Sequence, residues 1–224
     1  MRTQFERQLE ELHIELIKMG GLCEEAIRLS ANALMKKDRN LAERVFSLDG
    51  EIDQKERIIE NIGYRLLLQQ QPVAGDLRTV SAALKMISDL ERIGDQAADI
   101  AELSLYIEEG DSQSLLHIGD MAEAAVKMVT DSVEAFVKND LELARKVIDD
   151  DDKVDGLFNH VKDELRSMID GHNIETQSAL DLLMAAKYLE KIGDHAVNLA
   201  EWVVYSITGQ RENNEHQPGS NTER

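Results

Sequence analysis

The stretch LERIGDQAADIAEL, residues 90–103, has the apolar spacing of a helix but carries a glycine, Gly94, in its interior. The stretch nearly recurs as LEKIGDHAVNLAEW at residues 189–202. At this offset of 99, nine of the seventeen positions from residue 90 to residue 106 are identical in the two copies. Duplication is the simplest explanation, so we expect the second half of the chain to repeat the plan of the first.

The composition favours helices. The 224 residues include only 2 Pro and 13 Gly, and aromatic residues make up 4% of the chain. Leu, Ala, Glu, Ile and Lys, which tolerate long helices well, are abundant. Because the hydrophobic share of 42% is enough to build a core, we predict an all-α protein.

Six long helices are expected, three in each half. A seam of apolar and small residues in alternating steps of four and three predicts the first helix. Asp38 and Asn40 can cap the second helix, and Pro72 follows its end. Gly110 is expected to end the third. The predicted ranges are about 5–37, 40–70, 76–109, 112–138, 140–170 and 175–208.

Short connections between these helices predict two sequence-related three-helix up-and-down bundles in tandem, lying side by side. The first bundle is expected to span residues 1–110 and the second residues 111–209. Residues 210–224 have almost no apolar side chains, which predicts a disordered tail.

The charge and the cysteine content exclude several classes of function. The formal net charge of −19 opposes binding to nucleic acid or to an anionic lipid surface and attracts metal ions or basic protein surfaces. A solvated acidic surface is the simpler alternative. Cys23 is the only cysteine, so no disulfide within the chain can form, and its apolar neighbours predict burial. No signal peptide or apolar stretch of about twenty residues is present, which predicts a cytoplasmic protein without membrane insertion.

Pairs of acids four residues apart accompany the repeat. Such side chains lie on one face of a helix, about one turn apart. Two pairs on adjacent antiparallel helices would offer four carboxylates, which suit hard cations such as Mg, Mn, Fe or Ca. The candidate metal ligands are Asp49 and Asp53, Glu91 and Asp95, Asp151 and Asp155, and Glu190 and Asp194.

The spacing alone is a weak signal, because 44 acids in this chain predict about nine such pairs by chance. Recurrence in both halves and a position beside the apolar side of the helix favour metal binding over a solvated acidic rim. Gly94 and Gly193 each cost about 1 kcal/mol relative to Ala inside a helix, so we expect a neighbour to approach closely there. Weaker candidate ligands extend the polar column, namely Asp99, Glu102, Asn198 and Glu201.

No catalytic constellation is present. His195 has Gln96 as its counterpart, so a histidine common to both halves is excluded and a surface position is expected. Glu10 and His13 form a single ExxH motif, whereas ferritin-like di-iron bundles need two. An adaptor protein without catalytic activity is therefore favoured over two alternatives, a metal-dependent phosphate-ester hydrolase and a helical scaffold without metal.

The motifs PVAGDLR at residues 72–78, LERIGD at 90–95 and LEKIGD at 189–194 resemble those of the PhoU family of bacterial phosphate-uptake regulators. The resemblance covers nearly the whole chain to about Gly209. It implies that the four acidic pairs are that family's E(D)xxxD motifs, which hold multinuclear clusters of divalent or trivalent ions such as iron, zinc, manganese or magnesium.

The resemblance also implies a cytoplasmic homodimer without enzymatic activity. Such a protein represses phosphate-starvation genes by linking the ATPase subunit of the phosphate ABC transporter to a membrane sensor histidine kinase. The second half departs from the pattern, because HNIETQ at residues 172–177 replaces PVAGDLR and Asn198 replaces the acid found at Asp99. We therefore expect the second site to be weaker or to hold fewer ions.

Overall fold

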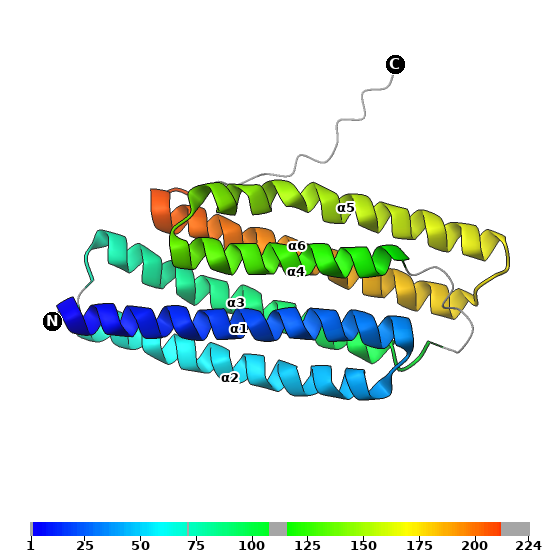
Figure 1. The fold of residues 1–224 in the computed structure, drawn as a ribbon, viewed down its shortest axis with the longest axis horizontal. Helices are drawn as coiled ribbons and strands as arrows, with labels where there is room; N and C mark the ends of the chain where they lie inside the picture. The colour runs from blue at the N-terminus through cyan, green and yellow to red at the C-terminus, as the bar shows by residue number, and fades with distance from the viewer. Residues whose placement is uncertain (1, 71, 108–115, 212–224) are drawn as a thin grey trace, which may run out of the picture.

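The structure is a computed structural model that describes residues 2–70, 72–107 and 116–211. These residues form six helices and no strand, which confirms the all-α prediction (Figure 1). The helices are α1 (Arg2–Lys36), α2 (Arg39–Gln70), α3 (Ala74–Leu103), α4 (Leu116–Lys138), α5 (Leu141–Asp170) and α6 (Thr176–Thr208).

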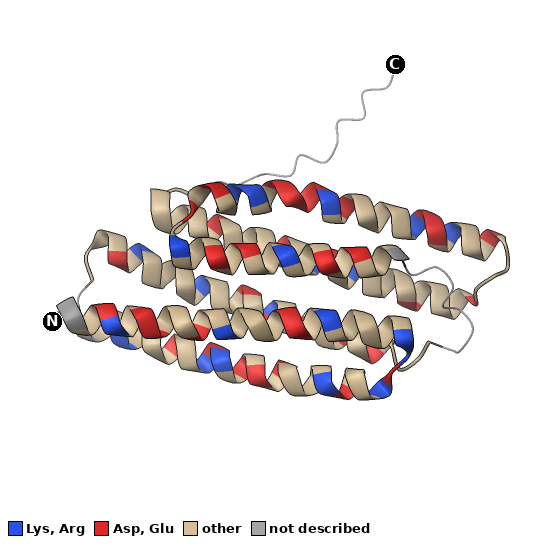
Figure 2. Cartoon of the chain, viewed as in Figure 1, with Lys and Arg blue, Asp and Glu red and all other residues tan. Residues whose placement is uncertain are grey.

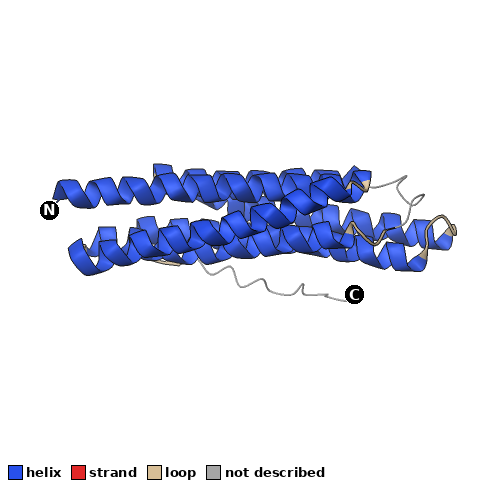
Figure 3. Cartoon of the chain, turned by 90° about the horizontal axis from the view of Figure 1, so that it is seen from below, coloured by secondary structure: helices blue, strands red, loops and turns tan. Residues whose placement is uncertain are grey.

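The helices lie nearly parallel and antiparallel in an elongated molecule (Figures 1 and 3). Helices α1, α2 and α3 pack together, as do α4, α5 and α6. The two bundles meet through α3 against α6, the most extensive helix contact in the molecule, and through α1 against α4. Helices α2 and α5 contact only helices of their own bundle and therefore form the two outer sides.

The predicted seam of α1 is the buried face of that helix. Leu12, Leu16, Met19 and Cys23 are all fully buried, which confirms the periodicity and the burial of the cysteine. The buried apolar residues of all six helices form one continuous core that spans both bundles. Positive and negative residues are interspersed along the helices (Figure 2).

Aspartate side chains cap the N-termini of two helices, a position that Asp commonly occupies. Asp38 Oδ1 accepts a hydrogen bond from the backbone N–H of Asn40 at 2.9 Å, so Asp38 caps α2 while Asn40 lies in its first turn. Asp140 Oδ1 accepts from the N–H of Leu143 at 3.0 Å and caps α5. Helix α3 begins two residues before Asp76, after a residue that provides no side-chain cap.

Helix α3 ends at Leu103, so the prediction that it continues to about Glu109 is wrong. The Ser104 hydroxyl donates to the carbonyl of Ala101 at 2.6 Å. The N–H groups of Leu105 and Tyr106 bond to carbonyls three residues earlier, at 3.0 and 3.1 Å, which tightens the last turn. The expected stop at residue 110, the expected start of the fourth helix at 112 and the tail from residue 212 lie outside the described residues.

The end of α6 is tied to the start of α3. Gly209 adopts a left-handed conformation with φ of 78°, and its N–H bonds to the carbonyl of Tyr205 at 2.9 Å. Arg78 of the PVAGDLR motif donates from Nε to the carbonyl of Ser206 at 3.5 Å.

Within the described residues, no helix is both long and apolar enough to span a membrane.

Candidate metal centre

Gly94 lies where α2 passes closely over α3. A Cβ atom added at Gly94 would lie 3.0 Å from Ile52 Cδ1 and 3.3 Å from Asp49 Oδ1. The glycine therefore makes room for an aspartate and an isoleucine of the preceding helix. The close approach expected from the sequence is present and is made by side chains of α2.

The second repeat has the same arrangement with more space. A Cβ atom added at Gly193 of α6 would lie 3.4 Å from Val154 Cγ1 and 3.5 Å from Asp151 Oδ1, both on α5. These separations are ordinary van der Waals contacts. In each bundle, an aspartate of the outer helix thus lies against the glycine of the LExIGD motif.

The first centre brings both predicted acidic pairs of its bundle into one electrostatic cluster. Asp49 Oδ1 is buried and has no hydrogen-bond partner among the residues that the structure describes. Burial raises the pKa of Asp49 above its ordinary value, and the nearby charges of Asp95, Asp53 and Asp99 raise it further. Burial also raises the pKa of Glu91, followed by the charge of Asp95. These carboxylates repel one another and favour a cation or protons among them.

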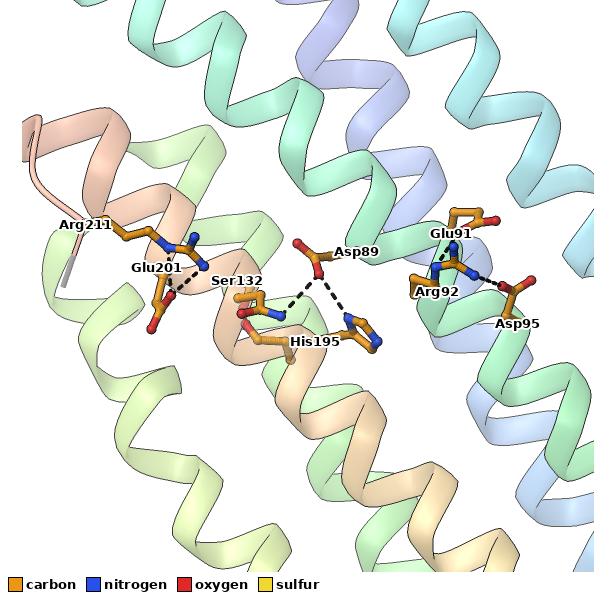
Figure 4. A network of polar contacts seen from close by, with 10 residues as sticks. Asp89, Glu91, Arg92, Asp95, Ser132, His195, Glu201 and Arg211 are labelled. Carbon is orange, nitrogen blue, oxygen red and sulfur yellow. Dashed lines mark hydrogen bonds and ion pairs between the residues drawn. The ribbon is translucent and has the colours of Figure 1, made fainter. Parts of the chain in front are cut away.

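Arg92 supplies an exposed positive charge to this cluster. Its Nε lies 3.5 Å from Glu91 Oε2, and its Nη1 donates to Asp95 Oδ2 at 3.0 Å (Figure 4). The side chain of Arg92 is 61% exposed, so it reaches the acids from the solvent side. An exposed ion pair of this kind contributes little stability and is readily exchanged for another cation.

The donor set fits a hard metal ion. Within residues 2–70, 72–107 and 116–211, no three His, Cys, Asp or Glu side chains already converge on one point. However, the buried oxygen of Asp49 has no hydrogen-bond partner among the described residues, and Asp53 and Asp95 lie near enough to raise its pKa. Glu91 joins the cluster through the same two acids, and all of these donors are carboxylate oxygens. Rotation of partly exposed carboxylates would close such a site, and oxygen donors suit Mg²⁺, Mn²⁺ and iron ions.

Glu56 belongs to this cluster, although the sequence analysis did not select it. Burial, Glu60 and Asp53 raise its pKa, and its charge in turn contributes to the raised pKa of Glu91. Glu56 follows Asp53 by three residues, so it continues the acidic face of α2 by one turn. This spacing was visible in the sequence, but the second half has no acid at the equivalent position 158.

The second centre contains a built-in positive charge. Asp151 is buried and Asp155 is half-buried. The pKa of Asp194 is raised by burial and then by Glu190, while Lys187 opposes the shift. Lys187 Nζ bonds to Glu190 and lies 5.6 Å from the ring centre of Phe158, the residue at the place of Glu56. Because Phe158 and Asn198 stand in place of Glu56 and Asp99, this centre has two acids fewer than the first, and Lys187 adds an ammonium group.

The weaker candidate ligands have different surroundings. Burial and the charge of nearby Asp95 raise the pKa of Asp99, so Asp99 belongs to the first cluster. Glu102 is exposed. Asn198 Nδ2 donates to Asp89 Oδ1 at 3.3 Å, and buried Glu201 accepts from Arg211 Nη2 at 2.9 Å (Figure 4).

One polar contact between the repeats was not predicted. His195, expected at the surface, is only 25% exposed, and its Nδ1 lies 3.0 Å from Asp89 Oδ1 across the α3–α6 interface (Figure 4). Asp89 has Tyr188 as its counterpart in the second half, so no internal repeat marks it. Only the packing of α3 against α6 brings these two side chains together.

This architecture defines a class of protein, the duplicated three-helix bundle with an acidic face in each repeat. A model of the PhoU domain matches residues 16–104 and 118–203. The chain belongs to the PhoU family. It is 38% identical over 212 residues to a phosphate-specific transport system accessory protein PhoU homolog of Clostridium acetobutylicum, covering 94% of this chain and 97% of that protein. An Aquifex aeolicus homolog of the same name is 39% identical, with 94% and 96% covered.

Solved structures agree with the fold. The crystal structure of PhoU from Pseudomonas aeruginosa superposes with a TM-score of 0.85 at 34% identity, covering 92% of this chain and 100% of that one. The phosphate transport system regulatory protein PhoU from Streptococcus pneumoniae gives a TM-score of 0.85 at 27% identity, covering 93% and 99%. The recognition made from the three motifs is therefore confirmed.

Proposed function

We propose that this chain is a non-enzymatic regulator of phosphate uptake and phosphate homeostasis. The observation that carries the proposal is the alignment with relatives named as accessory proteins of phosphate-specific transport, which covers nearly all of this chain and nearly all of each relative. In this proposal the chain acts as a cytoplasmic homodimer and a negative regulator of phosphate-starvation genes. Its partners are the ATPase subunit of the phosphate ABC transporter and a membrane sensor histidine kinase.

The proposal includes metal binding by the acidic pairs. In the first centre, Asp49, Asp53, Glu91 and Asp95 would hold the ion, and Arg92 would give up its contacts with the acids. In the second centre, Asp151, Asp155, Glu190 and Asp194 would hold it, in competition with Lys187. A bound ion would supply positive charge to an acidic surface, which is what an approaching phosphate or phosphate-bearing partner needs.

The two centres are expected to differ in affinity. The unsatisfied Asp49 oxygen and the additional acid Glu56 favour cation binding in the first centre. The Lys187–Glu190 ion pair must break before a cation reaches the second. The first centre is therefore expected to bind metal more tightly and to retain more ions.

The regulatory role is tested by deleting the gene in its own host. In phosphate-rich medium, deletion is expected to switch on a phosphate-starvation reporter, and a plasmid copy is expected to silence it. A reporter that stays silent after deletion contradicts the regulatory proposal. Capture of the ATPase subunit and the kinase by tagged protein, and a dimer mass by light scattering, test the partners separately.

Metal binding is tested by elemental analysis of untagged protein. Wild-type protein is compared with the Glu91→Ala, Asp95→Ala variant and with Glu43→Ala, which removes an exposed acid outside the centre. Stoichiometric metal should be lost only in the first variant. Equal metal content in all three proteins contradicts the assignment. Turnover of a generic phosphate ester by the metal-loaded wild type contradicts the non-enzymatic role.

A further inference from the structure

A second kind of polar cluster lies between α4 and α5, away from the acidic pairs that face each other between α5 and α6. A cavity of about 550 Å³ opens there, lined by side chains from the start of α4, the last part of α5 and the turn that follows. Its lining includes His117, His160, Asp163 and Glu164. The histidines come from different helices, so the fold and not a local motif brings them together.

The two imidazole rings have a spacing that suits one shared metal ion. Their ring centres are 5.3 Å apart, with an angle of 46° between the ring planes. Zinc–nitrogen bonds are about 2.0 Å long, so two imidazoles at tetrahedral positions around one ion have ring centres about 5 Å apart. The separation of the two rings is therefore the one that a shared ion requires, and rotation of the side chains would bring their nitrogens onto it.

Glu164 orients the first of these rings. Its Oε1 lies 2.5 Å from Nδ1 of His117. A carboxylate accepts hydrogen bonds, so Nδ1 of His117 carries a proton and Nε2 is the ring nitrogen left for a metal ion. A carboxylate behind a histidine is the usual support for a metal-binding imidazole, because it fixes the ring and raises its basicity.

Asp163 provides the third donor. His160, Asp163 and Glu164 are at positions i, i+3 and i+4 of α5 and therefore share one face of the helix. His160 and Asp163 are exposed, so both can rotate towards Nε2 of His117, although these donors do not yet meet at one point. The nearby basic residues Lys162 and Arg166 are engaged with Asn159 and Asp170, respectively.

We propose that His117, His160 and Asp163 bind a first-row divalent transition metal, with Glu164 as the supporting carboxylate of His117. Two imidazoles and one carboxylate leave room for water or another ligand, a donor set that suits Zn²⁺. This site differs in chemistry from the all-oxygen centres and does not depend on them.

The test is a Zn²⁺ titration of the full chain near pH 7.5 in competition with a chromophoric zinc indicator. The test variant carries both His117→Ala and His160→Ala. The matched control is His172→Asn, which removes an imidazole from the same end of the molecule. Asn tolerates the left-handed conformation of His172, whose φ is 56°. The double variant should lose one equivalent of bound Zn²⁺, whereas the control and the Glu91→Ala, Asp95→Ala variant should retain it.

Glu164→Gln distinguishes a supporting carboxylate from a simple neighbour, because removal of such a group weakens metal binding about 10- to 100-fold. Nitrogen-detected spectra of the wild type give an independent readout. One equivalent of Zn²⁺ should shift the imidazole signals of His117 and His160 and leave that of His172 in place. Equal zinc binding by the double variant, or unmoved imidazole signals, would overturn the proposal.

Discussion

Gly94 and Gly193 occupy equivalent places in the two repeats, but alanine at each is expected to change stability in opposite directions. Both glycines lie inside helices, where Ala is favoured over Gly by about 1 kcal/mol. The difference arises from the space that the new methyl group enters. This pair of substitutions therefore tests the packing of the two acidic centres directly.

At Gly193 the nearest atom would be Val154 Cγ1 at 3.4 Å, so the methyl group fits and the helix gains stability. At Gly94 it would meet Ile52 Cδ1 at 3.0 Å and Ile52 Cγ2 at 3.3 Å. Ile52 is fully buried, and its Cγ2 can move only by turning the whole β-branched side chain. Overpacking a core in this way costs about 1–3 kcal/mol.

Gly193→Ala is thus expected to stabilise the metal-free protein by about 0.5–1 kcal/mol, and Gly94→Ala to destabilise it by about 1 kcal/mol. Urea unfolding followed by circular dichroism at pH 7, with chelator present, measures both free energies. If Gly94→Ala stabilises the protein as much as Gly193→Ala does, the close packing of Ile52 and Asp49 over Gly94 is wrong.

Three further predictions follow from buried or paired groups. Burial and Asp95 raise the pKa of Asp49 in the folded chain, so ionised Asp49 destabilises the fold at neutral pH, and this penalty disappears as the pH falls through the folded pKa. Asp49→Asn should therefore raise the urea midpoint of metal-free protein at pH 7 and have little effect near pH 3; a lower midpoint at pH 7 would contradict this. A double-mutant cycle of Asp89→Ala and His195→Ala should give a coupling of about 0.5–1.5 kcal/mol in urea unfolding, and no coupling would show that their contact is unimportant. Burial raises the pKa of the Cys23 thiol, so a thiol reagent should react with it only after unfolding in urea; rapid labelling of the native protein would refute its burial.

The helices could be predicted from the sequence because burial imposes their period. Leu12, Leu16 and Met19 lie at the spacing of one helical face, and all three are buried. The end of α3 could not be predicted, because the apolar pattern continues past Leu103. After Leu103 the N–H groups of Leu105 and Tyr106 bond to carbonyls three residues earlier instead of four, a local change of geometry that the apolar period does not contain.

The candidate centre could be predicted as far as it repeats. Recurrence selected Asp49 and Glu91, and the structure places them in one cluster of mutually repelling acids. Glu56 and Lys187 have no counterparts in the other half, so a search for recurring residues does not find them. The contact of Asp89 with His195 depends on how α3 meets α6, which a pattern along one helix does not contain.

The contact between α3 and α6 also links the stability of the two repeats. These two helices carry the repeated LExIGD motif, and the buried residues on both sides of their contact belong to one core. A single repeat made alone would leave that face of its inner helix open to water and would lose the hydrophobic stabilisation of the contact. We therefore expect the two halves to unfold as one cooperative unit, because each repeat buries the inner helix of the other.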